Sequence, residues 1–315
     1  MAPLRFGLIG TSYWALNTHG AALVRSPHCQ LEGVWGRDPA KAGDVAGHLG
    51  TKAYEDLDEL LGHVDAVAMS VPPDVQATLA VRAARAGCHL LLEKPLALDV
   101  AQGQAVVDAI DAAGTAALVF FTARFLPDIE GWTEQAAQAG PWPSAHMLKY
   151  ANIYQPGSPF GASPWRRERG ALWDNGPHAI AGLLPIMGPV SSVVARRGAA
   201  GSDTVHLMLA HGTGSPTSPT GTSVVSLSLT MAPGDNLDHL ALYQQGASST
   251  RPEASFDAAD VMGNALAELA ALVETGQRAH RCDPRFALEV TRVLAGAEAA
   301  LQLPGADLPA AGAHR

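Results

Sequence analysis

The stretch LRFGLIGTSYWALNTHG, residues 4–20, decides how the chain folds. Apolar residues at 4–9 predict a buried strand, Gly10 predicts a tight turn, and residues 15–24 predict a helix. A strand, a glycine turn and a helix are how a dinucleotide-binding βαβ unit begins, although Ser12 replaces the second glycine of the fingerprint G-x-G-x-x-G. The stretch predicts a nucleotide site, and the alternative is an ordinary tight turn between a strand and a helix.

The individual positions of this turn suit a bound pyrophosphate. Gly10 permits the bend, and Ala15 stands where the helix must pack closely on the strand. The Ser12 hydroxyl can hydrogen-bond a phosphate oxygen, and the helix start directs backbone N–H groups at the same charge. We therefore expect Gly10, Thr11, Ser12, Trp14 and Ala15 to bind the cofactor, with Trp14 near its nicotinamide end.

The first 120 residues or so alternate strand and helix patterns. Such alternation predicts parallel strands joined by crossover helices, and the strands lack a polar face because helices cover both sides of the sheet. We expect a doubly wound Rossmann-type domain at residues 1–123. The expected strands are 4–9, 31–35, 65–71, 89–92 and 116–121, and the expected helices are 15–24, 39–49, 75–86 and 100–113.

The pattern changes after residue 123. Several strands follow one another there without helices between them, which predicts an open, mainly antiparallel sheet in an α+β domain at 124–302. This domain would bind substrate and form oligomers. Residues 212–223 are expected to form a flexible hairpin loop and 303–315 a flexible tail. The expected strands are 144–154, 191–195, 204–210, 223–230 and 239–243, and the expected helices are 126–140, 177–187, 257–275 and 284–302.

Composition excludes several classes of protein. The 315 residues carry a formal net charge of −9, whereas nucleic-acid-binding proteins are normally basic. Three widely separated cysteines and no C-x-x-C argue against disulfides and against a metal site. No apolar run is long enough to span a bilayer, and a strand beginning at residue 4 leaves no room for a signal peptide. We expect a cytoplasmic protein.

The end of the second strand bears on the choice of cofactor. An acidic residue there would bind the ribose hydroxyls of NAD, but Gly36 holds that place and Arg37 follows. Arginine can stack on adenine and pair with a 2'-phosphate. We expect NADP(H) in preference to NAD(H). The alternative is that Arg37 is a solvated surface residue and Asp38 only caps the next helix.

Two further motifs carry chemistry. A buried strand runs into Glu93-Lys94-Pro95, which places Lys94 at the carboxyl edge of the sheet, where ligands bind in open α/β folds. The stretch GALWDNGPHAI, residues 170–180, puts His178 in the first turn of a helix, and the positive helix end favours its neutral, proton-accepting form. Asp174 lies four residues earlier. Each residue alone is compatible with a surface or packing role.

These motifs together, with VPP at 71–73, ARF at 123–125 and PWR at 164–166, resemble the Gfo/Idh/MocA oxidoreductase family over nearly the whole chain. The resemblance implies that Lys94 contacts substrate and the nicotinamide ribose, and that His178 is the acid/base, with Asp174 beside it. Further cofactor contacts are expected from Ser70, Pro72, Glu93, Trp165 and Arg166, and substrate contacts from Arg124, Tyr154 and Asn175.

Three positions depart from the family pattern. Gln76 replaces a frequent histidine, Thr122 a frequent asparagine, and Ala181 an acid that helps to bind polyols. The substrate is therefore expected to differ from the common inositols and hexoses.

The expected reaction is hydride transfer between nicotinamide and a carbinol or carbonyl carbon of a sugar, polyol or related small molecule. His178 would exchange the hydroxyl proton, Lys94 would polarise the oxygen, and Asp174 would hold the histidine or a neighbouring hydroxyl. Two alternatives remain: glycoside hydrolysis with transient oxidation by a retained NAD, and nucleotide sensing without catalysis. A homo-oligomer, dimer or tetramer, is expected through the open sheet.

Overall fold

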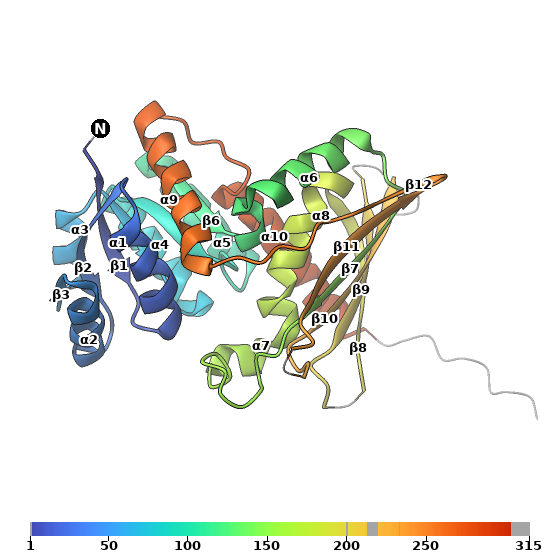
Figure 1. Cartoon of the computed structure of the whole chain (residues 1–315), viewed down its shortest axis with the longest axis horizontal. Helices are drawn as coiled ribbons and strands as arrows, with labels where there is room; N and C mark the ends of the chain where they lie inside the picture. The colour runs from blue at the N-terminus through green and yellow to red at the C-terminus, as the bar shows by residue number, and fades with distance from the viewer. Residues whose placement is uncertain (1, 200, 213–219, 233, 304–315) are drawn as a thin grey trace, which may run out of the picture.

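The structure, a computed structural model, describes residues 2–199, 201–212, 220–232 and 234–303. Most of the predicted loop at 212–223 and nearly all of the predicted tail at 303–315 lie outside the described residues. Each half of the molecule contains one six-stranded sheet, and Figure 1 shows the second sheet nearly edge-on beside the first half. The predicted fold class is confirmed.

The first sheet is parallel throughout, with the order β3-β2-β1-β4-β5-β6. The strand order reverses between β1 and β4, and ligands bind at the carboxyl ends of the strands at such a point. Strands β4 and β6 are buried along their whole length, as expected for a sheet covered on both faces. The strands are β1 (Leu4–Ile9), β2 (Cys29–Trp35), β3 (Lys52–Tyr54), β4 (Ala66–Met69), β5 (His89–Glu93) and β6 (Ala117–Phe120).

The helices of this half agree with the sequence pattern except at two places. The helix after β1 begins as a π-helix, η1 (Ala15–Gly20), and continues as α1 (Ala21–Arg25). Strand β3 and helix α3 (Leu57–His63) were not predicted, because a strand of three residues and a helix of seven leave little periodicity to read. The remaining helices are α2 (Pro39–Leu49), α4 (Pro73–Arg85) and α5 (Val100–Ala113).

The second sheet is mixed, with the order β12-β11-β7-β10-β9-β8. Strands β7 and β10 pair in parallel, whereas the other neighbours are antiparallel, so the expected antiparallel run holds except at the centre. The strands are β7 (Ser144–Tyr150), β8 (Val190–Arg197), β9 (Val205–His211), β10 (Gly221–Ser228), β11 (Leu237–Gln244) and β12 (Ala247–Thr250).

Helices cover one face of this second sheet. In Figure 1, α6 and α8 lie on the side that faces the first half, and the opposite side of the sheet carries no helix of the described chain. Helix α7 was not predicted, because its sequence is highly charged and Gly170 breaks it with φ +63°. The chain passes between the halves through η2 (Thr122–Phe125), and the helices are α6 (Pro127–Ala139), α7 (Pro164–Asp174), α8 (Gly176–Met187), α9 (Ala258–Thr275) and α10 (Pro284–Ala300).

The last two helices return to the first half of the molecule. Helix α9 packs on η1, α1 and β6, and its Asn264 donates to the Phe125 carbonyl oxygen. Helix α10 packs on α5 as well as on β8. A boundary at residue 123 therefore follows the chain but not the packing, since α9 packs on the first half and α10 packs on both halves. None of the helices in the described part of the chain combines the length and apolar character needed to cross a membrane.

Candidate active site

The turn after β1 leaves room for nothing larger than glycine at its first position. Gly10 has φ +136°, and a Cβ there would lie 2.2 Å from the Ser70 carbonyl oxygen at the end of β4. Gly10 is buried, and the ends of β1 and β4 lie close together at the point where the strand order reverses. This close approach fits a bound dinucleotide, because a side chain at Gly10 would fill the space between the two strand ends.

Ser12 caps the helix and keeps a donor for a ligand. Its Oγ accepts a hydrogen bond of 3.1 Å from the Ala15 N–H and lies 3.5 Å from the Ser70 Oγ. A hydroxyl that accepts one bond still has a proton to donate. Ser12 is exposed and Ala15 is buried against the strand, so both substitutions in the fingerprint fit the positions that they occupy.

Glu93 connects this turn to the neighbouring motif. Its Oε1 accepts hydrogen bonds from Trp14 Nε1 at 2.6 Å and from His19 Nε2 at 2.8 Å. Trp14 is thereby held at the residue before Lys94, and its expected place near the nicotinamide stays a prediction. The Glu93 Oε1 thus serves the protein itself, and the expected contact of Glu93 with the cofactor stays a prediction. His19 was not predicted, because its role depends on a buried contact with a residue 74 positions away.

Gln76 holds the backbone on both sides of Lys94. Its Nε2 donates to the carbonyl oxygens of Glu93 at 2.6 Å and Pro95 at 3.1 Å, and its Oε1 accepts from the Glu93 N–H at 2.8 Å. The side chain is fully buried in α4, which begins after Pro72. The departure from histidine at this position therefore has a structural use: the amide fixes the loop that carries Lys94.

The end of β2 presents no acidic side chain to the ribose hydroxyls of a bound cofactor. A Cβ on Gly36 would lie 2.5 Å from Thr11 Cγ2, so an acidic side chain does not fit there unless Thr11 moves. Arg37 is exposed and makes no hydrogen bond or ion pair with the described residues. Asp38 caps α2 through the N–H groups of Ala40 and Lys41.

Lys94, Asp174 and Arg166 form a buried ion cluster between the halves of the molecule. Lys94 Nζ donates to Asp174 Oδ1 and to its carbonyl oxygen, both at 2.8 Å, and Arg166 Nε donates to Asp174 Oδ2 at 2.9 Å. Burial alone would raise the pKa of Asp174, but the two cations outweigh it and hold that pKa below its usual value. The carboxylate therefore stays ionised and fixes both cations.

His178 lies in the first turn of α8 and is partly exposed. Burial, with the positive charges of Lys94, Lys149 and Arg251, lowers its pKa well below the ordinary value, so the ring is neutral at pH 7. The ring makes no hydrogen bond to any described residue, and both Asp174 oxygens are bound elsewhere. Asp174 thus binds Lys94 and Arg166 and makes no hydrogen bond to this ring, and its expected contact with a neighbouring substrate hydroxyl stays a prediction.

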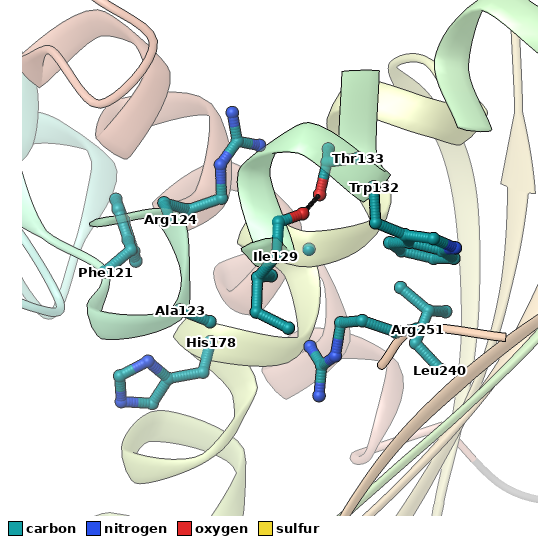
Figure 2. Close-up of a pocket in the computed structure, with 10 residues that line it drawn as sticks. Phe121, Ala123, Arg124, Ile129, Trp132, Thr133, His178, Leu240 and Arg251 are labelled. Carbon is teal, nitrogen blue, oxygen red and sulfur yellow. Dashed lines mark hydrogen bonds between the residues drawn. The ribbon is translucent and has the colours of Figure 1, made fainter. Parts of the chain in front are cut away.

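A small pocket opens beside His178. Figure 2 shows His178 and Arg251 on its wall, with Ile129 and Leu240 near Arg251. The pocket lies between α6, α8 and β11. Its walls are Phe121, Ala123, Arg124, Ile129, Trp132, Thr133, His178, Gly182, Leu240 and Arg251.

The segment before α7 brings aromatic side chains over the cofactor turn. The Arg166 guanidinium lies 4.7 Å from the Trp165 ring centroid and 5.2 Å from that of Phe160. Phe160 meets Tyr13 and Trp14 edge-on at centroid distances of 5.9 Å. Arg166 thus contacts Phe160, which in turn contacts the nucleotide turn, and the cofactor contacts expected of Trp165 and Arg166 stay predictions. Phe160 was missed, since no pattern marks a loop residue as a contact between domains.

The three residues expected to contact substrate make hydrogen bonds within the protein, and their substrate contacts stay predictions. Asn175 is buried and donates both amide hydrogens to the carbonyl oxygens of Lys149 and Ser228. Arg124 is also buried, and it donates to Glu130 and to the Ala181 carbonyl oxygen, although it does border the pocket. Tyr154 donates to the Arg166 carbonyl oxygen at 2.6 Å. No group of three or more His, Cys, Asp or Glu residues in the described chain is arranged to hold a metal ion.

Comparison with known proteins agrees with this geometry. Residues 4–121 match the profile described as "Oxidoreductase family, NAD-binding Rossmann fold", the GFO_IDH_MocA family. D-xylose 1-dehydrogenase (NADP(+)) 2 of Haloferax volcanii is 29% identical, over 61% of this chain and 60% of its own length. UDP-N-acetylglucosamine 3-dehydrogenase of Acidithiobacillus ferrooxidans is 32% identical, over 34% of this chain and 33% of its own.

The likeness extends over both halves in three dimensions. GenD2 from gentamicin A biosynthesis, solved in complex with NAD, superposes with a TM-score of 0.81 at 20% identity, covering 95% of this chain and 94% of that one. In sequence, the match spans between about a third and three fifths of the length of the first curated relatives. The shared fold is therefore that of the whole chain, whereas the family profile matches residues 4–121.

Proposed function

Because the N-terminal domain belongs to the Gfo/Idh/MocA oxidoreductase family, we propose that the chain is an NAD(P)-dependent dehydrogenase or reductase. Its substrate is a sugar, polyol or related small molecule, oxidised at a carbinol carbon or reduced at a carbonyl carbon. The observation that carries the proposal is the Lys94, Asp174 and Arg166 cluster, which joins the cofactor half to the α7–α8 segment carrying His178. The dehydrogenase names of the relatives support the same reaction class.

His178 moves the proton. A neutral imidazole with free ring nitrogens accepts the hydroxyl proton during oxidation and returns it during reduction. Its lowered pKa keeps the ring in the accepting form at neutral pH. The bound nicotinamide supplies the exchange of hydride.

Lys94 binds the oxygen of the reacting carbon. Its ammonium has three hydrogens, and Asp174 takes two of them through Oδ1 and the carbonyl oxygen. The third is left for the substrate oxygen, where it stabilises the negative charge that develops when the hydroxyl loses its proton. Arg166 keeps Asp174 in place, so the direction of the third N–H is fixed before substrate binds.

The cofactor is bound by the turn at Gly10 to Ala15, with NADP(H) in preference to NAD(H). The support is the missing acid at Gly36 together with the unpaired guanidinium of Arg37. Arg37 would pair with a 2'-phosphate in solvent, so its contribution is moderate.

The test follows reduced cofactor by absorbance with NADPH and NADH against a panel of sugars, polyols and carbonyl compounds. We expect turnover with NADPH favoured, and we expect Arg37→Ala to lower kcat/KM for NADPH about 10-fold while leaving NADH nearly unchanged. Retained NAD with no net turnover in any direction would contradict the proposal, and a clear preference for NADH would remove the role of Arg37.

The outer face of the second sheet supports a homo-oligomer. Val194, Met208 and Val224 lie opposite one another on β8, β9 and β10 and are all exposed, so they form an apolar stripe across three strands. Apolar residues aligned on an uncovered sheet face suit a second copy of the chain. Light scattering of the protein and of Met208→Glu tests this assignment.

A further inference from the structure

The surroundings of His178 contain more positive than negative charge. Two aspartates and four cations lie in two ion clusters beside it, and each cluster has one carboxylate for two cations. The first cluster is the one described above. The second consists of Lys149, Asp238 and Arg251.

The second cluster occupies positions where the sheet pattern predicts apolar residues. On β7, Lys149 shares a face with the buried residues Ala145 and Met147, because side chains alternate along a strand. On β11, Asp238 shares a face with the buried Leu240, and register places Asp238 directly opposite Lys149. Charges on the helix-covered face of a sheet are costly, so a structural role alone is a poor reason for them.

This cluster lies beside the first turns of α8. Asn175, at the start of that helix, donates to the Lys149 carbonyl oxygen. A Cβ on Gly182, one turn beyond His178, would lie 3.8 Å from Arg251 Nη1. Arg251 and His178 border the same pocket, which Figure 2 shows. Lys149 and Arg251 are therefore close to the proposed site of proton transfer.

One carboxylate cannot balance both cations. Lys149 Nζ is 2.5 Å from Asp238 Oδ2, and Arg251 binds Asp238 through Oδ1 and the carbonyl oxygen. The side chain of Arg251 is 6% exposed and that of Lys149 is 20% exposed. Two largely buried cations share one carboxylate, so the cluster keeps a net positive charge that an anionic ligand would balance. The remaining exposure of Lys149 leaves a path for one.

We propose that the substrate carries an anionic group, a carboxylate or a phosphate, and that Lys149 and Arg251 bind it on the β7 and β11 side of His178. The inference rests on the proposed function and specifies its substrate class. Lys149 and Arg251 thus determine specificity, while the Lys94 cluster carries out the reaction.

The experiment compares matched compounds with the full chain. Glucose, gluconate, glucuronate and glucose 6-phosphate, with the corresponding galactose series, are tested for turnover with NADP(H) and for binding to the NADPH-loaded protein by calorimetry. We expect at least one anionic member to exceed its neutral parent about 10-fold in kcat/KM, or in affinity, which is about 1.4 kcal/mol. The carboxylate and phosphate members separate the two sources of negative charge.

Substitutions at position 149 identify the binding group. Lys149→Met is expected to raise KM or Kd for the anionic member at least 10-fold, with kcat changed less than about threefold. Lys149→Arg is expected to restore the KM or Kd of the anionic member. The KM or Kd of the neutral parent is expected to change little in either variant. Lys52→Met on edge strand β3 is the matched control. Folding is checked by NADPH affinity, which a local change at β7 should leave intact.

The outcomes separate the two proposals. Turnover of neutral sugars with no advantage for their acids or phosphates overturns the anionic-substrate inference and leaves the dehydrogenase proposal standing. A Lys149→Met effect that is equal for neutral and anionic compounds also overturns it, because a structural role predicts that result. Binding of an anion that depends on Lys149, without turnover, supports the inference and counts against the reaction. No binding and no turnover with any anion overturns the inference.

Discussion

The molecule contains the same charge arrangement twice, at two places near His178. In each, one aspartate lies between a lysine and an arginine. The first cluster comprises Lys94, Asp174 and Arg166, and the second comprises Lys149, Asp238 and Arg251.

Their surroundings differ. The side chain of Asp174 is 5% exposed and joins the loop after β5 to α7, whereas that of Asp238 is 37% exposed and joins two paired strands and the residue after β12. The carboxylate of the first cluster is therefore shielded from water, which suits the positioning of a reacting oxygen. The carboxylate of the second is in contact with solvent, and Lys149 beside it is the cation that a ligand can reach. The two clusters carry the same charges but suit different roles, because their burial and the elements that they join differ.

The largest expected effect lies in the first cluster. Lys94→Met should lower kcat about 10²- to 10³-fold, because the donor that stabilises the developing charge is lost. Lys149→Met should act on KM alone. Steady-state kinetics with the substrate found by the panel measure both, with Lys52→Met as control. A similar fall in kcat from both variants would remove the functional difference between the clusters.

Stability should separate the clusters next. Asp174→Asn leaves two buried cations without a carboxylate and should lower the free energy of unfolding by about 3–5 kcal/mol. Asp238→Asn should cost only about 1 kcal/mol, since water reaches that carboxylate. Urea denaturation at pH 7 measures both variants, and equal losses would contradict the burial argument.

The stability of the wild-type protein in acid should depend on the ionised carboxylate of Asp174. The pKa of Asp174 is lowered in the fold, so its contribution is complete above the pKa of an unfolded aspartate, about 4, and is lost as pH falls through the lower folded value. Below pH 4, Asp174→Asn should therefore lose less stability than wild type does. Denaturation of both proteins from pH 7 down to pH 3 tests this. Parallel dependence of their stabilities on pH would show that Lys94 and Arg166 do not lower the pKa of Asp174.

The smallest expected effect is on the pH profile. His178 must be neutral to accept a proton, so kcat/KM for oxidation should rise through its lowered pKa and be level around pH 7. Removing the charge in Lys149→Met should move this limb to higher pH, and Lys149→Arg should leave it in place. The limb should remain below the ordinary histidine range, because burial is the largest cause of the lowered pKa. An unmoved limb would show that Lys149 is too far from His178 to act on it.

The first cluster was largely readable from sequence, and the second was not. Lys94, Asp174 and His178 lie in short motifs whose residue types and local turns indicate chemistry without any knowledge of packing. Lys149 lies in a strand with no motif, and Arg251 follows a strand of four residues that periodicity did not reveal. Asn175 and Arg124 were expected to bind substrate because they lie inside motifs, yet both are buried in hydrogen bonds to the backbone and to Glu130.

The sequence by itself determined the alternation of strand and helix, the glycine turn at Gly10 and the order of the motifs, because these depend on residues close together in the chain. Only the tertiary structure decided which charges meet. In the folded chain Asp174 binds Lys94 and Arg166 and not His178, and Asp238 lies opposite Lys149 on the neighbouring strand. Electrostatic effects depend on distance and burial in space, and those are fixed only when segments far apart in the chain have packed.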